Sequence, residues 1–267
     1  MILSTTRFCK IAGVLNITPD SFSDGGQCLS PKQAIAFGKQ MLADGANILD
    51  IGAEASGPCS TPVALKEELN RILEAVQELA PLTTISIDTF KSEVASACLE
   101  LGAKIINDIS ALRYDSNMAS VIANANAKVI LMYSKEPANA PHVSNYEPIY
   151  NNVLDDICAF LTQRVDYAIS RGIKQSNIIL DPGMGRFLSK DTQISWQVLR
   201  EFKRIVELGF PVMIGTSRKG FLGGKLSERD YASAITALNA ATKGASIIRT
   251  HNPKLTLETL SIWNKMI

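Results

Sequence analysis

The sequence predicts a single-domain α/β protein, a (β/α)8 or TIM barrel that takes in residues 1–267. Eight short apolar runs rich in β-branched residues alternate with stretches of helical periodicity, and a glycine closes several of those stretches. Alternating strands and helices build a parallel sheet, and eight such units in about 250 residues suggest a closed barrel. An open doubly wound sheet is the alternative, which is weakened because no G-x-G-x-x-G follows an early strand.

Each expected strand is a short apolar run that stops at turn-forming or polar residues. Such runs are typical of strands buried in a parallel sheet. The eight runs span residues 11–15, 48–52, 85–88, 105–108, 129–132, 178–181, 212–215 and 247–250.

The expected helices lie between these runs. Residues 65–79 place Leu65, Leu69, Ile72 and Val76 three and four positions apart, which is the spacing of one helix face. A glycine in the left-handed conformation commonly ends a helix just before the next strand. Further helices are expected at residues 31–44, 150–171, 194–208 and 231–243, and the capping glycines are Gly45, Gly102, Gly172, Gly209 and Gly244.

The composition excludes several classes of protein. The net charge is only +1, so a nucleic-acid-binding face is not expected. No apolar stretch approaches the roughly 20 residues of a membrane span, and residues 1–10 do not resemble a signal peptide. The five cysteines form no C-x-x-C pair, which favours free thiols in the cytoplasm. The two histidines lie far apart in sequence, which argues against a zinc site.

Polar and ionisable residues follow almost every expected strand. In a barrel, the carboxyl ends of the strands meet at one rim, where the active site lies. Helix capping alone is the better explanation of Asp108 and a fair one of Asp50. A purely structural rim would not need the cations among these residues. The strand-end set comprises Asn16, Asp50, Glu54, Asp88, Asn107, Asp108, Tyr133, Asp181, Ser217, Arg218, Lys219, Arg249 and His251.

The acids and amides of this set suit a polar heterocycle. An aminopyrimidinone presents a ring N–H and an amino group on one edge, and a single carboxylate can accept from both. Asp88, Asn107 and Asp181 offer such acceptors. Lys219 can donate to the carbonyl oxygen of the same ring.

The remaining groups suit an anion and a metal ion. Arg249 and His251 are donors for a phosphate group. The first strand runs into a polar loop, G-V-L-N-I-T-P-D-S-F-S-D-G-G at residues 13–26, which carries Asn16 and one phenyl ring, Phe22. Its oxygens suit Mg²⁺, which takes a few protein oxygens together with water and phosphate. From the residues alone, we expect a barrel enzyme that handles a polar ring and a phosphate-bearing group.

Six segments resemble, in order, the motifs of the dihydropteroate synthase family, and the resemblance extends over nearly the whole chain. They are N-I-T-P-D-S-F-S-D-G-G at residues 16–26, I-S-I-D-T-F-K at 85–91, I-I-N-D-I at 105–109, D-P-G-M-G at 181–185, S-R-K at 217–219 and I-R-T-H at 248–251. The resemblance implies a transferase of folate biosynthesis that condenses 7,8-dihydropterin-6-ylmethyl diphosphate with p-aminobenzoate, through an SN1-like C–O cleavage. It also implies Mg²⁺ as cofactor and a homodimer.

The resemblance also implies roles for individual residues. The pterin would be bound by Asp88, Asn107, Met132, Asp181 and Lys219, and the diphosphate by Asn16, Ser56, Arg249 and His251. The p-aminobenzoate would lie against Phe22, Ser56, Pro58, Lys219 and Gly220, with Asn16 as the metal ligand. The catalytic residues would be Asp88, Lys219, Arg249 and His251.

The chain departs from the family pattern at three places. In the second loop, D-I-G-A-E-A-S-G-P-C at residues 50–59, Gly57 replaces a usual Arg and Ser56 a usual Thr. Gly220 follows S-R-K where Ser is usual, and Tyr133 follows the fifth strand where the family has His. The pterin side is therefore expected to be standard and the p-aminobenzoate side altered.

The altered side raises the question of sulfonamides, which mimic p-aminobenzoate. The strings D-P-G-M-G-R-F-L-S and R-T-H-N-P resemble acquired sulfonamide-insensitive synthases, although drift within a divergent lineage accounts for them equally well. A steric clash with the drug would come from Phe22, Arg186 or Phe187.

Two other functions fit part of the pattern. A pterin-binding methyltransferase shares the barrel and the pterin carboxylates but lacks the S-R-K and R-x-H residues, which this chain has. An inactive pterin-binding paralogue is favoured only by Gly57.

Overall fold

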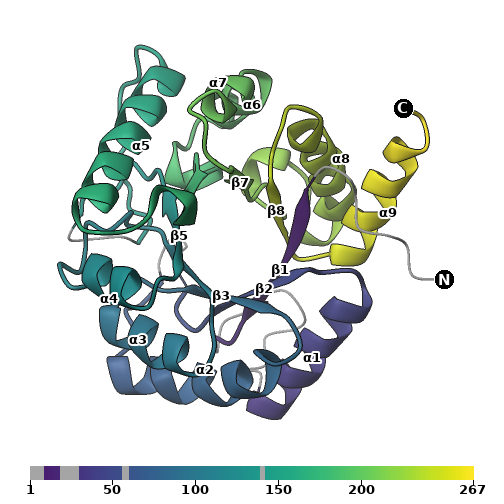
Figure 1. Cartoon of the computed structure of the whole chain (residues 1–267). Coiled ribbons are helices and arrows are strands. Elements are labelled where there is room, and N and C mark those ends of the chain that lie inside the picture. Colours follow the sequence, from purple (N-terminus) through teal and green to yellow (C-terminus); the bar gives the residue numbers. More distant parts are fainter. Residues whose placement is uncertain (1–8, 19–29, 56–59, 139–141) are drawn as a thin grey trace.

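The computed structural model describes residues 9–18, 30–55, 60–138 and 142–267, in which strands and helices alternate along the chain (Figure 1). The strands are β1 (Lys10–Asn16), β2 (Ile48–Gly52), β3 (Thr84–Asp88), β4 (Ile105–Asp108), β5 (Lys128–Met132), β6 (Ile178–Asp181), β7 (Met213–Ile214) and β8 (Ile247–Thr250). The α-helices are α1 (Pro31–Ala43), α2 (Leu65–Leu79), α3 (Ser92–Glu100), α4 (Met118–Asn124), α5 (Val153–Ser170), α6 (Thr192–Arg200), α7 (Lys203–Val206), α8 (Arg229–Thr242) and α9 (Pro253–Asn264).

The strands form one parallel sheet in the order β6-β5-β4-β3-β2-β1-β8-β7. β1 pairs with β8, so that Ile11 lies opposite Ile248. The two ends of the order meet where Leu180 of β6 bridges Val212 and donates its amide to the Pro211 carbonyl at 2.9 Å. The ring of strands therefore closes, with the helices around it (Figure 1), and the predicted TIM barrel is confirmed.

All eight predicted runs contain a strand, but the helix predicted at residues 194–208 is wrong. The chain forms two helices there, because α6 ends at Arg200, its C-cap Glu201 has a ψ of +18°, and α7 begins at Lys203. Val198, Phe202 and Ile205 are all buried. The apolar spacing runs unbroken across the turn, so periodicity alone does not detect it.

The five predicted capping glycines all have positive φ, between +84° and +106°. At Gly45 a second requirement is added, since a Cβ there would lie 2.4 Å from Leu257 Cδ2 of α9. These caps set the directions in which the helices return to the sheet. None of the helices in the described residues combines the length and apolarity that a membrane span requires.

Two apolar regions make up the core. One lies between the outer face of the strands and the helices, and it includes Leu49, Ile87 and Ile106. The other is a layer inside the barrel, where alternate residues of successive strands meet. This inner layer consists of Ala12, Ile48, Ile105, Ile130, Ile179, Met213 and Ile247.

Candidate active site

The inward side chains change character two residues beyond the inner apolar layer. Because side chains alternate between the two faces of a strand, residues two apart point the same way. At this level the strands supply Asp50, Asn107, Met132, Asp181, Gly215 and Arg249, with Asp88 from β3 beside Asn107 in the strand register. The barrel interior is therefore apolar toward the amino ends of the strands and polar toward their carboxyl ends.

Most of these residues line one pocket at the carboxyl end of the strands. The loops after β4, β6 and β7 contribute its other walls. The lining residues are Asp88, Asn107, Ile109, Met132, Asp181, Gly183, Met184, Phe187, Gly215, Lys219 and Arg249. The structure thus brings together all five residues predicted to bind the pterin, and it adds Arg249.

An ion cluster occupies the floor of this pocket. The Arg249 Nε donates to Asp50 Oδ2 at 2.6 Å, and its Nη2 donates to Asp88 Oδ2 at 2.9 Å. The Asn107 amide donates to the same Asp50 oxygen at 3.1 Å. Asp50 is therefore part of the site, and helix capping, which was a fair explanation from the sequence, is wrong for it. Its inward position in β2 is the reason.

Two buried acceptors in this cluster are left without a partner in the described part of the chain. They are Asp50 Oδ1 and Asn107 Oδ1. An unpaired buried acceptor is costly, so these atoms indicate that a donor-bearing ligand completes the site. Asn107 lines the pocket, so its free acceptor suits an N–H donor on the edge of an aminopyrimidinone.

The titratable groups of the pocket are all perturbed. Burial raises the pKa of Asp88 to about 7, against the opposing effect of Arg249. Burial also raises the pKa of Asp181 to about 6, although the Gly183 amide donates to this carboxylate at 2.8 Å. Burial and the charge of Arg249 lower the pKa of Lys219 to about 8. Perturbed pKa values grouped in one cleft are typical of a functional site.

An aromatic and aliphatic wall faces the ion cluster. Phe90, Ile109 and Met132 pack together, and Phe187 lies against them. The Lys219 ammonium lies 4.9 Å from the centre of the Phe187 ring, a cation–π distance. A flat ring can therefore lie against an apolar wall while its edge meets acids and amides.

The loop after β6 approaches the barrel so closely that glycine is required. Gly183 has φ +66°, and a Cβ at this position would lie 2.3 Å from the Tyr133 carbonyl oxygen. This contact brings Met184 and Phe187 of the D-P-G-M-G-R-F string over the pocket.

Above the ion cluster lies a group of cations around His251. The His251 Nδ1 lies 3.0 Å from Ser217 Oγ, and its backbone amide donates to the same oxygen at 3.1 Å. Burial, Arg249, Arg218 and Lys219 lower the pKa of His251 to about 3, so its ring is neutral. The same three cations create a positive potential, which suits an anion.

Two strand-end residues point away from the pocket. Tyr133 packs edge-on against Phe160 at 5.2 Å on the outer side of the barrel, so it is no part of the site. Asp108 accepts from the Ser110 and Leu112 amides, both at 2.8 Å, and orders the loop after β4. Asp108 is therefore structural, but the predicted helix cap is wrong, because the carboxylate orders a turn and the next helix, α4, begins only at Met118.

The p-aminobenzoate residues are only partly visible. Phe22, Ser56, Gly57 and Pro58 lie outside the described residues. Gly220 is exposed at the start of η3 (Gly220–Leu222) and does not line the pocket. Asn16 is the half-buried last residue of β1. Its side chain and that of Asp88 both lie close to Gly52: a Cβ on Gly52 would be 3.7 Å from Asn16 Oδ1 and 3.3 Å from Asp88 Cβ.

Sequence reasoning missed an ion network beside the pocket. Lys91 lies between Glu54 and Glu68, at 2.6 Å from the latter, and His142 lies 2.7 Å from Glu54. Phe90, next to Lys91 in the chain, contacts the His142 ring edge-on at 5.6 Å. Lys91 belongs to the I-S-I-D-T-F-K string, but nothing in the local sequence points to His142.

Fold and site together define a barrel enzyme with a pocket for a polar flat ring and an adjacent cationic place for an anion. Residues 12–251 match the family model of pterin binding enzymes. A dihydropteroate synthase from Streptococcus pyogenes serotype M3 is 37% identical over 266 residues, covering 96% of this chain and 95% of that protein. The chain belongs to the dihydropteroate synthase family.

Solved structures agree. The Xanthomonas albilineans dihydropteroate synthase with 4-aminobenzoic acid aligns with a TM-score of 0.88 and 34% identity, covering 98% of this chain and 94% of that one. The Yersinia pestis enzyme, in a sulfonamide drug complex, gives a TM-score of 0.90 at 31% identity, covering 97% and 94%.

Proposed function

We propose that this chain joins 7,8-dihydropterin-6-ylmethyl diphosphate to p-aminobenzoate, giving 7,8-dihydropteroate and diphosphate, with the residues of the barrel pocket. The observation that carries the assignment of this pocket is the partnerless buried acceptor Asn107 Oδ1, on a residue that lines the pocket, together with the apolar wall. A ligand that is flat, with N–H donors on one edge, satisfies both features.

The pterin lies against Met132 and Phe187, with its pyrimidinone edge toward Asn107 and Asp181. Asp181 accepts hydrogen bonds from the ring N–H and from the amino group. One of its oxygens also accepts from the Gly183 amide, and this bond fixes the orientation of the carboxylate. Lys219 donates to the ring carbonyl. This role suits a lysine whose pKa burial and Arg249 lower to about 8, because it is still mostly protonated at neutral pH.

The diphosphate lies toward Arg249 and His251. Asp50 and Asp88 anchor the guanidinium, so the charge is placed before the substrate arrives. The imidazole ring of His251 is neutral and donates one hydrogen bond to the diphosphate. The cations that keep it neutral also stabilise the leaving diphosphate.

We place Mg²⁺ beside Asn16 and the diphosphate, where the substrate supplies part of its ligands. The described residues contain no group of three His, Cys, Asp or Glu that could bind a metal ion. Asn16 offers one amide oxygen, and Mg²⁺ readily takes a single protein oxygen with water and phosphate oxygens. When bound, the ion supplies positive charge for the departing diphosphate.

The chemical step is C–O cleavage ahead of C–N bond formation. The pterin methylene loses diphosphate, and the resulting cation is delocalised into the ring. Asp88 and Asp181 lie where an ionised carboxylate stabilises that charge. The arylamine of p-aminobenzoate then attacks, and it needs no strong base because its nitrogen is already nucleophilic.

The p-aminobenzoate is placed on the outer side of Lys219, near Gly220, with Phe22, Ser56 and Pro58 as its further contacts. Weakened sulfonamide inhibition belongs to the same proposal, because the family Arg is replaced by Gly57 on that side.

The enzyme is further proposed to act as a cytoplasmic homodimer. Cys98 and Cys158 form no disulfide within the described residues, which suits a reducing compartment. Tyr231 and Ile235 of α8 are 74% and 64% exposed, an apolar face that suits contact with a second copy.

The test is to incubate the chain with the pterin diphosphate, Mg²⁺ and p-aminobenzoate and to measure released diphosphate and dihydropteroate. Equal amounts of both are expected, with turnover lost in chelator. Pterin binding without turnover would indicate an inactive paralogue, and methyl transfer from methyltetrahydrofolate a methyltransferase. Turnover that persists unchanged in chelator would remove the metal role of Asn16.

The anion site has its own test. Arg249→Ala should weaken binding of the pterin diphosphate more than binding of the free pterin alcohol, as measured by calorimetry. Equal losses for the two ligands would place Arg249 away from the diphosphate.

A further inference from the structure

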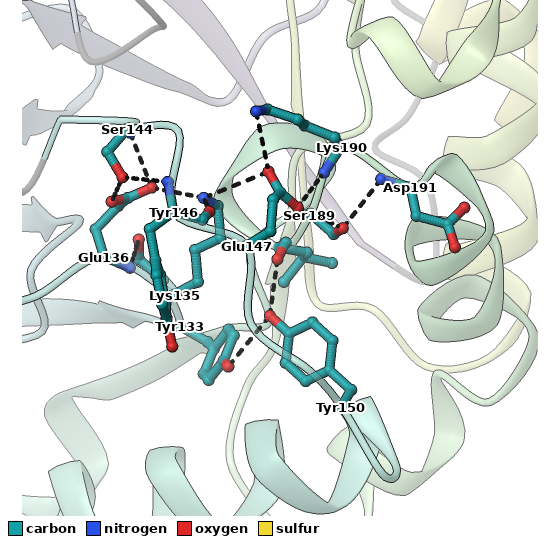
Figure 2. A network of polar contacts seen from close by, with 12 residues as sticks. Tyr133, Lys135, Glu136, Ser144, Tyr146, Glu147, Tyr150, Ser189, Lys190 and Asp191 are labelled. Carbon is teal, nitrogen blue, oxygen red and sulfur yellow. Dashed lines mark hydrogen bonds and ion pairs between the residues drawn. The ribbon is translucent and has the colours of Figure 1, made fainter.

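The described part of the connection between β5 and α5, residues 133–138 and 142–152, is joined by a polar network to the loop after β6 (Figure 2). The two loops come from neighbouring strands, since β5 pairs with β6. Among the described residues of the two loops, those that line the pterin pocket belong to the second loop and include Met184 and Phe187. The network therefore connects a loop outside the pocket to a wall of it.

Four consecutive residues of the pocket loop are each held by the β5–α5 connection. The Phe187 carbonyl accepts from the Lys135 amide at 3.0 Å, and the Leu188 carbonyl accepts from the Tyr150 hydroxyl at 2.7 Å. The Ser189 hydroxyl and the Lys190 amide both donate to Glu147 Oε2, at 2.8 and 2.9 Å. These four residues lie in a loop. Its one helical element is η2 (Gly185–Phe187), a single turn that ends at Phe187.

A buried ion pair fixes the other side of the network. The side chains of Lys135 and Glu136 are both 0% exposed, and their charged atoms lie 3.0 Å apart. Glu136 also accepts from the Ser144 amide and hydroxyl, at 2.9 and 2.6 Å, and the Lys135 ammonium donates to the Tyr146 carbonyl. The Lys135 Nζ lies 3.9 Å from Glu147 Oε1. Glu136 and the Tyr146 carbonyl hold the Lys135 ammonium, which attracts the Glu147 carboxylate without a hydrogen bond to it.

We infer that Glu147 and Lys135 are positioning residues for pterin binding: they hold residues 187–190 so that Phe187 closes the pocket beside Lys219. The inference rests on the proposed function and adds two residues that touch neither substrate. Phe187 is the link, because it packs on Met132 and lies 4.9 Å from the Lys219 ammonium. A shift of this ring changes both the apolar wall and the surroundings of the cation.

The alternative role is purely structural, in which the network stabilises the fold and leaves the pocket unchanged. A double-mutant cycle separates the two roles, because residues that act through one another do not contribute additively. Affinity for the pterin diphosphate is the decisive quantity, since a loss of stability alone lowers the active fraction but not the affinity of the folded enzyme.

The experiment compares wild type, Glu147→Ala, Phe187→Ala and the double variant by calorimetry with pterin diphosphate, together with Tm, kcat and KM. Asp155→Ala is the matched control, since it breaks the exposed ion pair with Arg204 on α5 and α7. Glu147→Ala is expected to weaken affinity about tenfold in the wild-type background and less than about twofold in the Phe187→Ala background. The control should leave affinity unchanged.

An equal loss in both backgrounds, or a fall in Tm with normal affinity, would overturn the positioning role. If wild type itself fails to bind the pterin diphosphate, the proposed function fails instead. Tyr150→Phe removes the hydrogen bond to Leu188 and the longer one, at 3.4 Å, from the Tyr133 hydroxyl. It serves as a second variant if Glu147→Ala does not fold. The same non-additivity with Phe187→Ala is expected of it, and additive losses would again overturn the inference.

Discussion

The two ends of the barrel interior are built from the same strands and differ completely in chemistry. Toward the amino ends of the strands, Ile48, Ile105, Ile179 and Ile247 form a layer without charge. Two residues further along the same strands stand Asp50, Asn107, Asp181 and Arg249. The distance between the levels is only about 6.6 Å at the usual strand rise.

The difference shows how a barrel tolerates buried charge. Buried carboxylates are expensive, and burial raises the pKa of Asp88 to about 7 and that of Asp181 to about 6. Asp181 follows Ile179 of the apolar layer on the same strand, and Asp88 stands on β3, which is paired with the strands of Ile48 and Ile105. One end therefore provides stability, and the other holds charged groups in a desolvated place where they bind a ligand strongly.

The largest effect is expected from placing a charge at the apolar end. Ile105→Asp puts a carboxylate into the inner layer, in which no residue carries a charge. The free energy of unfolding should fall by about 3–5 kcal/mol, whereas Ile105→Val should cost about 1 kcal/mol. Denaturant unfolding measures both. An Asp variant as stable as the Val variant would contradict the division between the two ends.

At the polar end, removing a charge is expected to reduce ligand affinity without reducing stability. Asp181→Ala should reduce pterin affinity by about 1–3 kcal/mol, because a donor edge loses its acceptor. The folded-state pKa of Asp181 is raised, so ionising it opposes folding at neutral pH. Stability at pH 8 should therefore hold or rise. Calorimetry with the pterin and thermal unfolding give the two numbers, and unchanged pterin affinity would place the ring elsewhere.

The pH dependence is the next effect in size. Asp181 and Asp88 must be ionised to stabilise the ring, so kcat/KM should rise as pH increases through about 6 to 7. Lys219 must be protonated, so kcat/KM should fall above about 8. The pKa of His251 is lowered to about 3, so this residue contributes no further rise or fall to the pH profile of kcat/KM near neutral pH. His251→Gln should lower the rate and leave both limbs in place; a displaced acid limb would assign that titration to the histidine.

Much of this site can be predicted from single-sequence reasoning, because strand ends carry its chemistry. Asn107, Asp181, Lys219 and Arg249 follow apolar runs, and the barrel brings every such end to one rim. Strict alternation along each strand sharpens this. It places Asp50 inward, two residues after Ile48, and Tyr133 outward, one residue after Met132.

The parts that could not be predicted depend on contacts between loops. His142 reaches Glu54 from a segment 88 positions away, and Glu147 holds Ser189 across 42. No periodicity or motif encodes such pairs, since they follow from the way two loops lie on adjacent strands. Ligand identity likewise came from the resemblance, because the side chains alone define only a polar ring and an anion.

The smallest expected effect concerns sulfonamides, at the outer side of the polar end. We expect a higher ratio of the sulfonamide inhibition constant to the p-aminobenzoate KM than a sensitive enzyme gives. Of the residues named for a clash, Phe187 is engaged in the pterin wall, and Phe22 lies outside the described residues. Arg186 is left, half-buried, with an Nε that finds no partner in the described part of the chain.

Arg186→Ala should therefore lower the ratio by about two- to fivefold, because specificity is a difference between two affinities and a small contact suffices. Gly220→Ser is the matched control. No atom of the described residues lies within 4 Å of a Cβ at that position, so the serine is expected to fit without strain and Tm should not change. Because the glycine opens space and excludes nothing, the ratio should not change either. A wild-type ratio equal to that of a sensitive enzyme would leave lineage drift as the explanation of Gly57 and Gly220, and a fall in Gly220→Ser alone would move the discriminating contact from Arg186 to the loop after β7.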